Sequence, residues 1–172
     1  TIMKDNQALG QGSAGRGGCL CFAVSDRWQL NVQGVTFENN SADWEGSVIY
    51  YETSMTNLVT WYFEEVEFLN NHAGTIGTIY APMIPEVSGS MEFQSVRWSQ
   101  NTAKKAPALY TTAGRLMSNI KMSNCIIQDN QATTEWSAMA LIFSTDSTVQ
   151  IEGCQFTNNS SDRKSTRLNS SH

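Results

Sequence analysis

The chain has 172 residues, with 11 basic and 16 acidic side chains and a formal net charge of -5. With 40% apolar and 10% aromatic residues it can bury a core, unlike intrinsically disordered chains. Because nucleic acids and anionic membranes are held by clustered Lys and Arg, the acidic balance disfavours both as partners. We therefore expect one moderately acidic folded domain.

A six-residue motif recurs along the chain and ends each time on an asparagine. Its first full copy is Val35-Thr-Phe37-Glu-Asn-Asn40. The later copies end at Asn71, Asn101, Asn130 and Asn159, and an Asp-Asn pair at Asn6 begins the series. Positions 6, 40, 71, 101, 130 and 159 give spacings of 34, 31, 30, 29 and 29. The chain is therefore a repeat with a period of about 30 residues.

Two short alternating segments precede each asparagine. In the first repeat, Leu30 and Val32 alternate with polar residues, and Val35 and Phe37 do so in a register shifted by one. Alternation predicts strands with one buried face, and the shift requires a corner between them. Such corners often adopt the left-handed backbone that Gly and Asn tolerate best. The predicted corner residues are Gly34, Glu65, Ser95, Asn124 and Gly153.

A third strand is predicted after a loop in each repeat, within residues 17–21, 46–50, 76–80, 106–110 and, less clearly, 137–143. We interpret the aliphatic row in these strands as facing inward, which places the tyrosines on the outer face. The inward row is Leu20, Ile49, Ile79 and Leu109, and the outward tyrosines are Tyr50, Tyr80 and Tyr110.

Three short strands per repeat, separated by corners, predict an all-β fold: a right-handed parallel β-helix of about five coils. Each strand then pairs with its counterpart one coil along, roughly 4.8 Å away, so like side chains stack. The repeated asparagines form a structural ladder, whose amides satisfy turn backbone groups or one another. This Asn ladder is Asn40, Asn71, Asn101, Asn130 and Asn159.

The two ends of the chain carry separate expectations. Residues 162–172 resemble the translation of a sequencing adapter, and we expect this tail to be disordered. Residues 1–161 are then a β-helix fragment truncated at both ends, with any signal peptide lying upstream of Thr1. No run of 18 apolar residues occurs, so no membrane insertion is expected within this fragment.

The repeats resemble a known family. Phe37-Glu-Asn-Asn40, Phe68-Leu-Asn-Asn71 and Phe156-Thr-Asn-Asn159 match the pattern F-x-x-N, and Gly17-Gly18-Cys19-Leu20 resembles the pattern G-G-A-[ILV]. These paired patterns are similar to those of polymorphic outer-membrane proteins, within the broad pectin-lyase-like β-helix fold. The resemblance implies an adhesin-like, non-enzymatic role at the cell surface or outside the cell.

An enzymatic role is the competing hypothesis. Polysaccharide lyases and hydrolases of the pectin-lyase-like fold use clustered Asp residues, and no such cluster occurs here, so any catalytic coils would lie outside this fragment. Glu64 and Glu67 flank a corner at a separation that glycosidases use, but a solvated polar face is the favoured interpretation. Arg97, one coil from Glu67, is expected to form a surface ion pair. His72 has no partner at metal-ligand spacing, so we expect no catalytic residue, metal or cofactor.

Two further features bear on function. Tyr50, Tyr80 and Tyr110 are predicted to stack on the outer face, where they either bind a glycan or surface protein or simply stabilise the sheet. Cys125 and Cys154 occupy one row in successive coils, at a separation compatible with a disulfide. Their parallel Cβ directions favour two stacked thiols instead.

Overall fold

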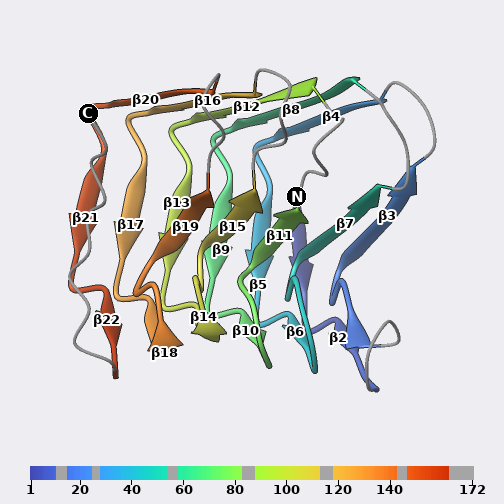
Figure 1. Cartoon of the computed structure of the whole chain (residues 1–172). Coiled ribbons are helices and arrows are strands. Elements are labelled where there is room, and N and C mark those ends of the chain that lie inside the picture. The colour runs from blue at the N-terminus through green and yellow to red at the C-terminus, as the bar shows by residue number, and fades with distance from the viewer. Residues whose placement is uncertain are drawn as a thin grey trace.

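The computed structural model describes residues 1–10, 15–24, 28–53, 58–82, 88–112, 118–142 and 147–162. In these residues, parallel strands wind into a solenoid in which each strand pairs with its counterpart about 30 residues along the chain (Figure 1). Phe37 lies opposite Phe68, and Ile79 lies opposite Leu109. The predicted all-β parallel β-helix is therefore confirmed.

Four sheets run along the solenoid, and two of them have six strands. Sheet A consists of β1 (Ile2–Lys4), β5 (Thr36–Glu38), β9 (Glu67–Leu69), β13 (Arg97–Ser99), β17 (Ile126–Gln128) and β21 (Gln155–Thr157). Sheet B consists of β2 (Gln7–Ala8), β6 (Ser41–Ala42), β10 (His72–Ala73), β14 (Thr102–Lys105), β18 (Gln131–Glu135) and β22 (Ser160–Ser161).

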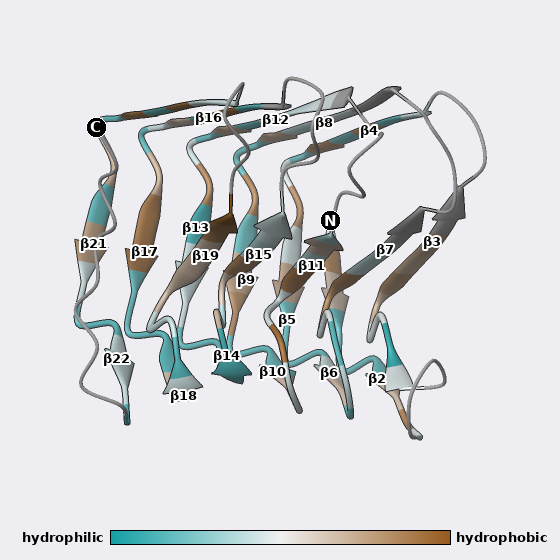
Figure 2. Ribbon diagram, in the orientation of Figure 1, coloured by the Kyte–Doolittle hydropathy of each residue, from teal (hydrophilic) through white to brown (hydrophobic). Residues whose placement is uncertain are grey.

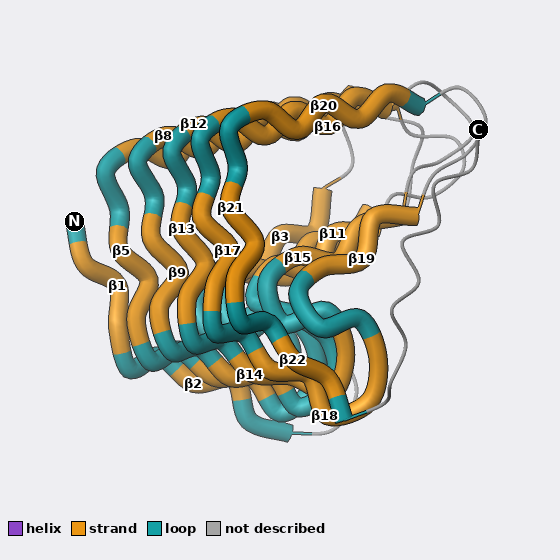
Figure 3. Tube along the Cα trace, turned by 90° about the vertical axis from the view of Figure 1, so that its left-hand side faces the viewer, coloured by secondary structure: helices purple, strands orange, loops and turns teal. Residues whose placement is uncertain are grey.

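The other two sheets have five strands each, which agrees with the coil number expected from the repeats. Sheet C consists of β3 (Leu20–Val24), β7 (Ile49–Thr53), β11 (Ile79–Pro82), β15 (Leu109–Thr112) and β19 (Met139–Ile142). Sheet D consists of β4 (Trp28–Gln33), β8 (Leu58–Glu64), β12 (Ser88–Gln94), β16 (Ser118–Ser123) and β20 (Thr148–Glu152). Figure 3 shows sheet A side-on, with sheet D above it and sheet B below.

The count of three strands per coil needs correction, because sheet B adds a fourth. Its strand β6 is only two residues long, and a period of two leaves no pattern in so short a segment. The third predicted strand also begins later than residue 46, at Ile49. Gly46 and, two coils along, Ala106 have φ of 64° and 43°, so a left-handed turn precedes this strand.

The predicted corners are left-handed in every repeat. Gly34, Glu65, Ser95, Asn124 and Gly153 have φ of 60°, 53°, 54°, 54° and 62°. A second left-handed position, which the sequence did not predict, is the residue just before each ladder asparagine: Asp5, Asn39, Asn70, Gln100, Asp129 and Asn158. These turns are hydrophilic in each coil (Figure 2). Each coil therefore bends at fixed points on both sides of sheet A.

The core is built of rows that stack from coil to coil. Phe37 and Phe68 lie 5.2 Å apart with an interplanar angle of 7°, and Trp98 continues the stack 5.5 Å from Phe68. The predicted inward row of sheet C is also correct, since Ile49, Ile79 and Leu109 are fully buried and Leu20 packs against this core. The interior therefore holds the coils together by continuous apolar contact.

The two ends of the described chain are open edges of these sheets. Phe156 in β21 and Ile151 in β20 are each 46% exposed, whereas their counterparts one coil earlier are buried. The backbone N–H of Asp162 still donates to the Ala132 carbonyl over 3.3 Å, so backbone pairing with the preceding coil extends to this residue. The predicted tail beyond it, from Arg163 onward, lies outside the described residues.

Candidate functional site

The asparagines lie inside the turn between sheets A and B and form a continuous chain of hydrogen bonds. The backbone N–H and side-chain Nδ2 of Asn40 both donate to Oδ1 of Asn71, over 2.9 and 3.1 Å. Asn71 makes the same two bonds to Asn101, over 3.0 and 2.9 Å. The pattern continues from Asn101 to Asn130 and from there to Asn159.

Each amide also reaches back to the preceding coil. Nδ2 of Asn71 donates to the carbonyl of Phe37, and Nδ2 of Asn101 donates to that of Phe68, over 3.1 and 2.9 Å. Asn71, Asn101 and Asn130 are fully buried, so each satisfies both amide hydrogens and its oxygen without water. The buried members of the Asn ladder thus have their amide groups bonded to neighbouring coils and turned away from solvent.

The three outward tyrosines of sheet C form a second ladder, made of rings. Tyr50 and Tyr80 have ring centroids 5.4 Å apart with planes 11° from parallel, and Tyr80 and Tyr110 are 5.3 Å and 14° apart. Because the rings stack along the solenoid axis, each inner ring face lies against a neighbour. The ladder therefore offers solvent mainly ring edges and hydroxyl groups.

The two ends of this tyrosine ladder are covered as well. The Arg16 guanidinium lies 4.8 Å from the Tyr50 ring centroid and pairs with Glu45 over 3.2 Å, and Tyr50 is only 4% exposed. At the other end the Trp136 ring lies 6.0 Å from that of Tyr110. Burial, followed by the charge of Glu45, raises the pKa of Tyr80, so its hydroxyl stays protonated at neutral pH. A sugar ring consequently has no free tyrosine face within the ladder, and a binding role for these tyrosines stays a prediction.

Among the described residues, the outward side chains of sheet D are mostly polar, with Tyr62 as an aromatic exception, and they lie in rows that follow the strand register. Over it lies a shallow trough of about 400 Å³. We call the short side chains that line it the floor row: Thr60, Ser90, Asn119 and Thr148. We call the longer side chains beside them the wall row: Tyr62, Glu92, Lys121 and Gln150. The trough therefore runs across the strands, along the solenoid.

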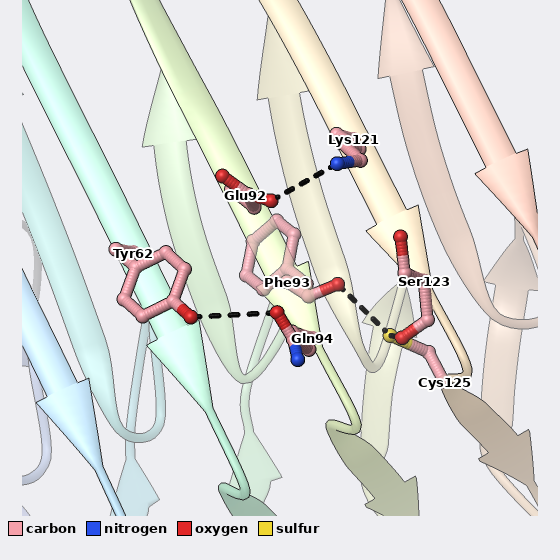
Figure 4. Close-up of polar contacts among 7 residues, drawn as sticks. All are labelled: Tyr62, Glu92, Phe93, Gln94, Lys121, Ser123 and Cys125. Atoms are coloured by element: carbon pink, nitrogen blue, oxygen red, sulfur yellow. Dashed lines mark hydrogen bonds and ion pairs between the residues drawn. The ribbon is translucent and has the colours of Figure 1, made fainter.

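Most of the charge in this trough is internally balanced. Lys121 Nζ lies 3.3 Å from Glu92 Oε1, and the Tyr62 hydroxyl donates to Gln94 Oε1 over 3.4 Å (Figure 4). Thr148 donates from Oγ1 to Asn119 Oδ1. Partial desolvation, and then the Glu64 carboxylate, raise the pKa of Tyr62, so its hydroxyl remains a neutral donor. The trough thus offers hydroxyl, amide and paired charged groups on one face.

Tyr62 differs from the sheet C tyrosines in its surroundings. Its neighbours in the same row are Asn31 and Glu92, and no aromatic ring contacts it within the described residues. Tyr62 does not belong to the row of repeating tyrosines that the sequence pattern marks as a candidate binding surface. A comparison of the outward row alone, rather than of the tyrosines that repeat, would have identified it, because it is the one aromatic residue among polar neighbours.

Two of the residues weighed for catalysis, Glu64 and Glu67, hydrogen-bond to polar side chains of the preceding coil. Glu64 accepts a hydrogen bond from Gln33 over 2.8 Å, and Glu67 accepts one from Thr36 over 3.3 Å. Arg97 is the register partner of Glu67, but the described residues show no ion pair between them, contrary to expectation. His72 contacts Thr102 over 2.8 Å. In the described part of the chain, no group of three His, Cys, Asp or Glu residues is placed to hold a metal.

The cysteines are free thiols in the described structure. Cys125 is buried, and its backbone N–H donates to Cys154 Sγ over 3.3 Å, so the two lie in one row as predicted. Burial raises the pKa of the Cys125 thiol to about 12, with the neighbouring Cys154 adding to the shift. A protonated thiol is a poor nucleophile, so Cys125 behaves here as a small core residue.

These observations define the chain as a parallel β-helix repeat protein whose coils are joined by an internal Asn ladder. Residues 34–52 match the family model of the Chlamydia polymorphic membrane protein repeat. The match spans a corner, a ladder asparagine and the start of β7, and with the fold it confirms the resemblance to β-helix repeats of this type. No curated protein and no solved structure matches the chain significantly. Within the described residues, no helix is long and apolar enough to cross a membrane.

Proposed function

We propose that this β-helix is a non-enzymatic module of a secreted or surface-displayed protein, which serves as a stalk or adhesive surface for glycans or other proteins. The observation that carries the proposal is the unbroken connection between coils. The Asn ladder and the Phe37–Phe68–Trp98 stack join successive coils, and sheet D turns a largely polar face to solvent. Such a rod presents ligand groups at fixed intervals. The repeat matched at residues 34–52 supports a surface setting.

Adhesion of the whole chain tests this function. Beads coated with the folded protein are expected to attach to cells or to extracellular matrix, whereas beads coated with urea-unfolded protein are not. Equal attachment of both coatings, or no attachment of either, would contradict the adhesive role.

A second assay separates this function from the enzymatic alternative, a fragment of a polysaccharide lyase or hydrolase. The protein is incubated with neutral and acidic polysaccharides, and reducing ends and unsaturated products are measured. We expect neither to accumulate. Product release that scales with protein concentration would show that the chain is catalytic and would overturn the proposal.

A further inference from the structure

We propose that the trough on sheet D is a binding site for a neutral, linear oligosaccharide lying along the solenoid axis. This inference rests on the proposed function, since it names the ligand and the face through which the module adheres. It concerns a different face from the tyrosine ladder of sheet C.

The spacing of the floor row fits a linear polymer. Thr60, Ser90 and Asn119 are register partners in successive coils, so short polar side chains recur at the inter-strand spacing of about 4.8 Å. This interval is close to the length of one pyranose unit in an extended chain. Hydroxyl and amide groups both donate and accept, as do the hydroxyls of a sugar. Each coil therefore supplies one polar contact for each successive sugar unit.

The wall row supplies the apolar contact that sugar rings need. The faces of Tyr50, Tyr80 and Tyr110 lie against other rings or charged groups, whereas no aromatic ring contacts Tyr62 among the described residues. Tyr62 is partly exposed at the edge of the trough. An aromatic face with a hydrogen-bonding rim suits the C–H face of a pyranose.

The charge pattern selects a neutral ligand. Glu92 and Lys121 are the charged residues that line the trough, and they pair with each other over 3.3 Å. An acidic polysaccharide would need an unpaired cation, and Lys121 is already paired with Glu92. A neutral chain can accept from Lys121 and donate to Glu92 without separating them.

Titration of the full chain with defined hexasaccharides tests this site. The neutral probes are the β-1,4-linked hexamers of glucose and of N-acetylglucosamine, and the acidic comparator is the hexamer of galacturonate. Calorimetry is expected to show binding of at least one neutral probe and at least tenfold weaker binding of the galacturonate hexamer. No binding of either neutral hexamer, or a preference for the acidic one, would overturn the inference.

Variants locate the binding to the trough. Tyr62→Ala is expected to weaken binding about tenfold or more, whereas Tyr62→Phe keeps most of the affinity because the ring face carries the contact. Ser90→Phe fills the floor row and is expected to abolish binding independently of Tyr62. Tyr80→Ala, on sheet C, is the matched control and should leave the affinity unchanged. A loss of binding with Tyr80→Ala and not with Tyr62→Ala would show that the tyrosine ladder is the site.

The outcome for this site can be separated from that for the proposed function. Enzymatic removal of cell-surface glycans is expected to abolish bead attachment. If coated beads attach equally well to deglycosylated cells, the glycan inference fails while the adhesive function stands. If the beads attach to nothing, the proposed function itself is wrong.

Discussion

Two side-chain ladders run along this solenoid, and they obey different rules. The asparagines continue without interruption from Asn6 to Asn159, each bonded to the next, and those from Asn40 to Asn130 are buried. The outer tyrosines occupy only three successive coils. The same row position is Cys21 in the coil before Tyr50 and Ala140 in the coil after Tyr110. A buried amide cannot be replaced without leaving donors unpaired, whereas an outward ring can give way to solvent. The fold therefore requires the buried asparagines, whereas the residue type in the outer tyrosine row can vary from coil to coil.

Removing one buried asparagine should have the largest effect. Asn101→Ala deprives the backbone N–H and Nδ2 of Asn71 of their acceptor. We expect the free energy of unfolding, measured in urea, to fall by about 3 kcal/mol or more, since each buried unpaired group costs roughly 1–3 kcal/mol. Asn159→Ala, in the partly exposed last coil, is the matched control and should cost clearly less. Equal losses would mean that the ladder contributes little beyond local packing.

Truncating the outer ladder at its centre should cost less. Tyr80→Ala removes two ring contacts, which contribute roughly 0.5–1.5 kcal/mol each, so we expect a loss of about 1–3 kcal/mol. Tyr62→Ala, where no ring contact is lost among the described residues, serves as the comparison. If urea unfolding gave the larger loss for Tyr62→Ala, stacking would not be what stabilises the sheet C row.

The corner between sheets D and A allows a backbone effect to be measured alone. Gly34 has a φ of 60°, and a Cβ added at this position would meet no atom within 4 Å. Gly34→Ala is therefore expected to lower stability by about 1 kcal/mol through the left-handed backbone itself. The reciprocal change Glu65→Gly, at the same corner one coil along, should raise it by a few tenths to about 1 kcal/mol. Changes of the same sign in both thermal melts would refute this account.

Alkaline pH should reveal the smallest effect. Because the pKa of Tyr80 is raised above its ordinary value of 10.0, the unfolded chain loses this proton before the folded chain does. The contribution of Tyr80 to the free energy of unfolding is fully present below pH 10 and is lost as the pH rises above 10. At pH 10.5 the loss from this group is no more than about 0.8 kcal/mol. Tyr80→Phe should flatten this part of the pH profile. An unchanged slope in that variant would assign the alkaline loss to other groups.

Much of the fold followed from local pattern alone. Period-two alternation located the strands of sheets A and D, and a one-residue shift located each corner, including Glu65 and Ser95, where no glycine marks the turn. Sheet B could not be predicted in this way, because two-residue strands such as β6 carry no periodicity. The left-handed residue before each ladder asparagine was not predicted either. The residue type at this position varies, for example Gln100 in one coil and Asp129 in the next, so no glycine or constant side chain marks the turn.

The sequence by itself determined the repeat, the identity of the stacked rows and the inward direction of the apolar side chains, because each depends on spacing along one chain. Only the tertiary structure decided which outward groups remain available. Tyr50 and Tyr62 are both outward tyrosines, yet one lies beneath Arg16 and the other borders an open trough. That difference arises because coil stacking places residues about 30 positions apart in contact, and the side chain above or below a ring decides whether its face is free.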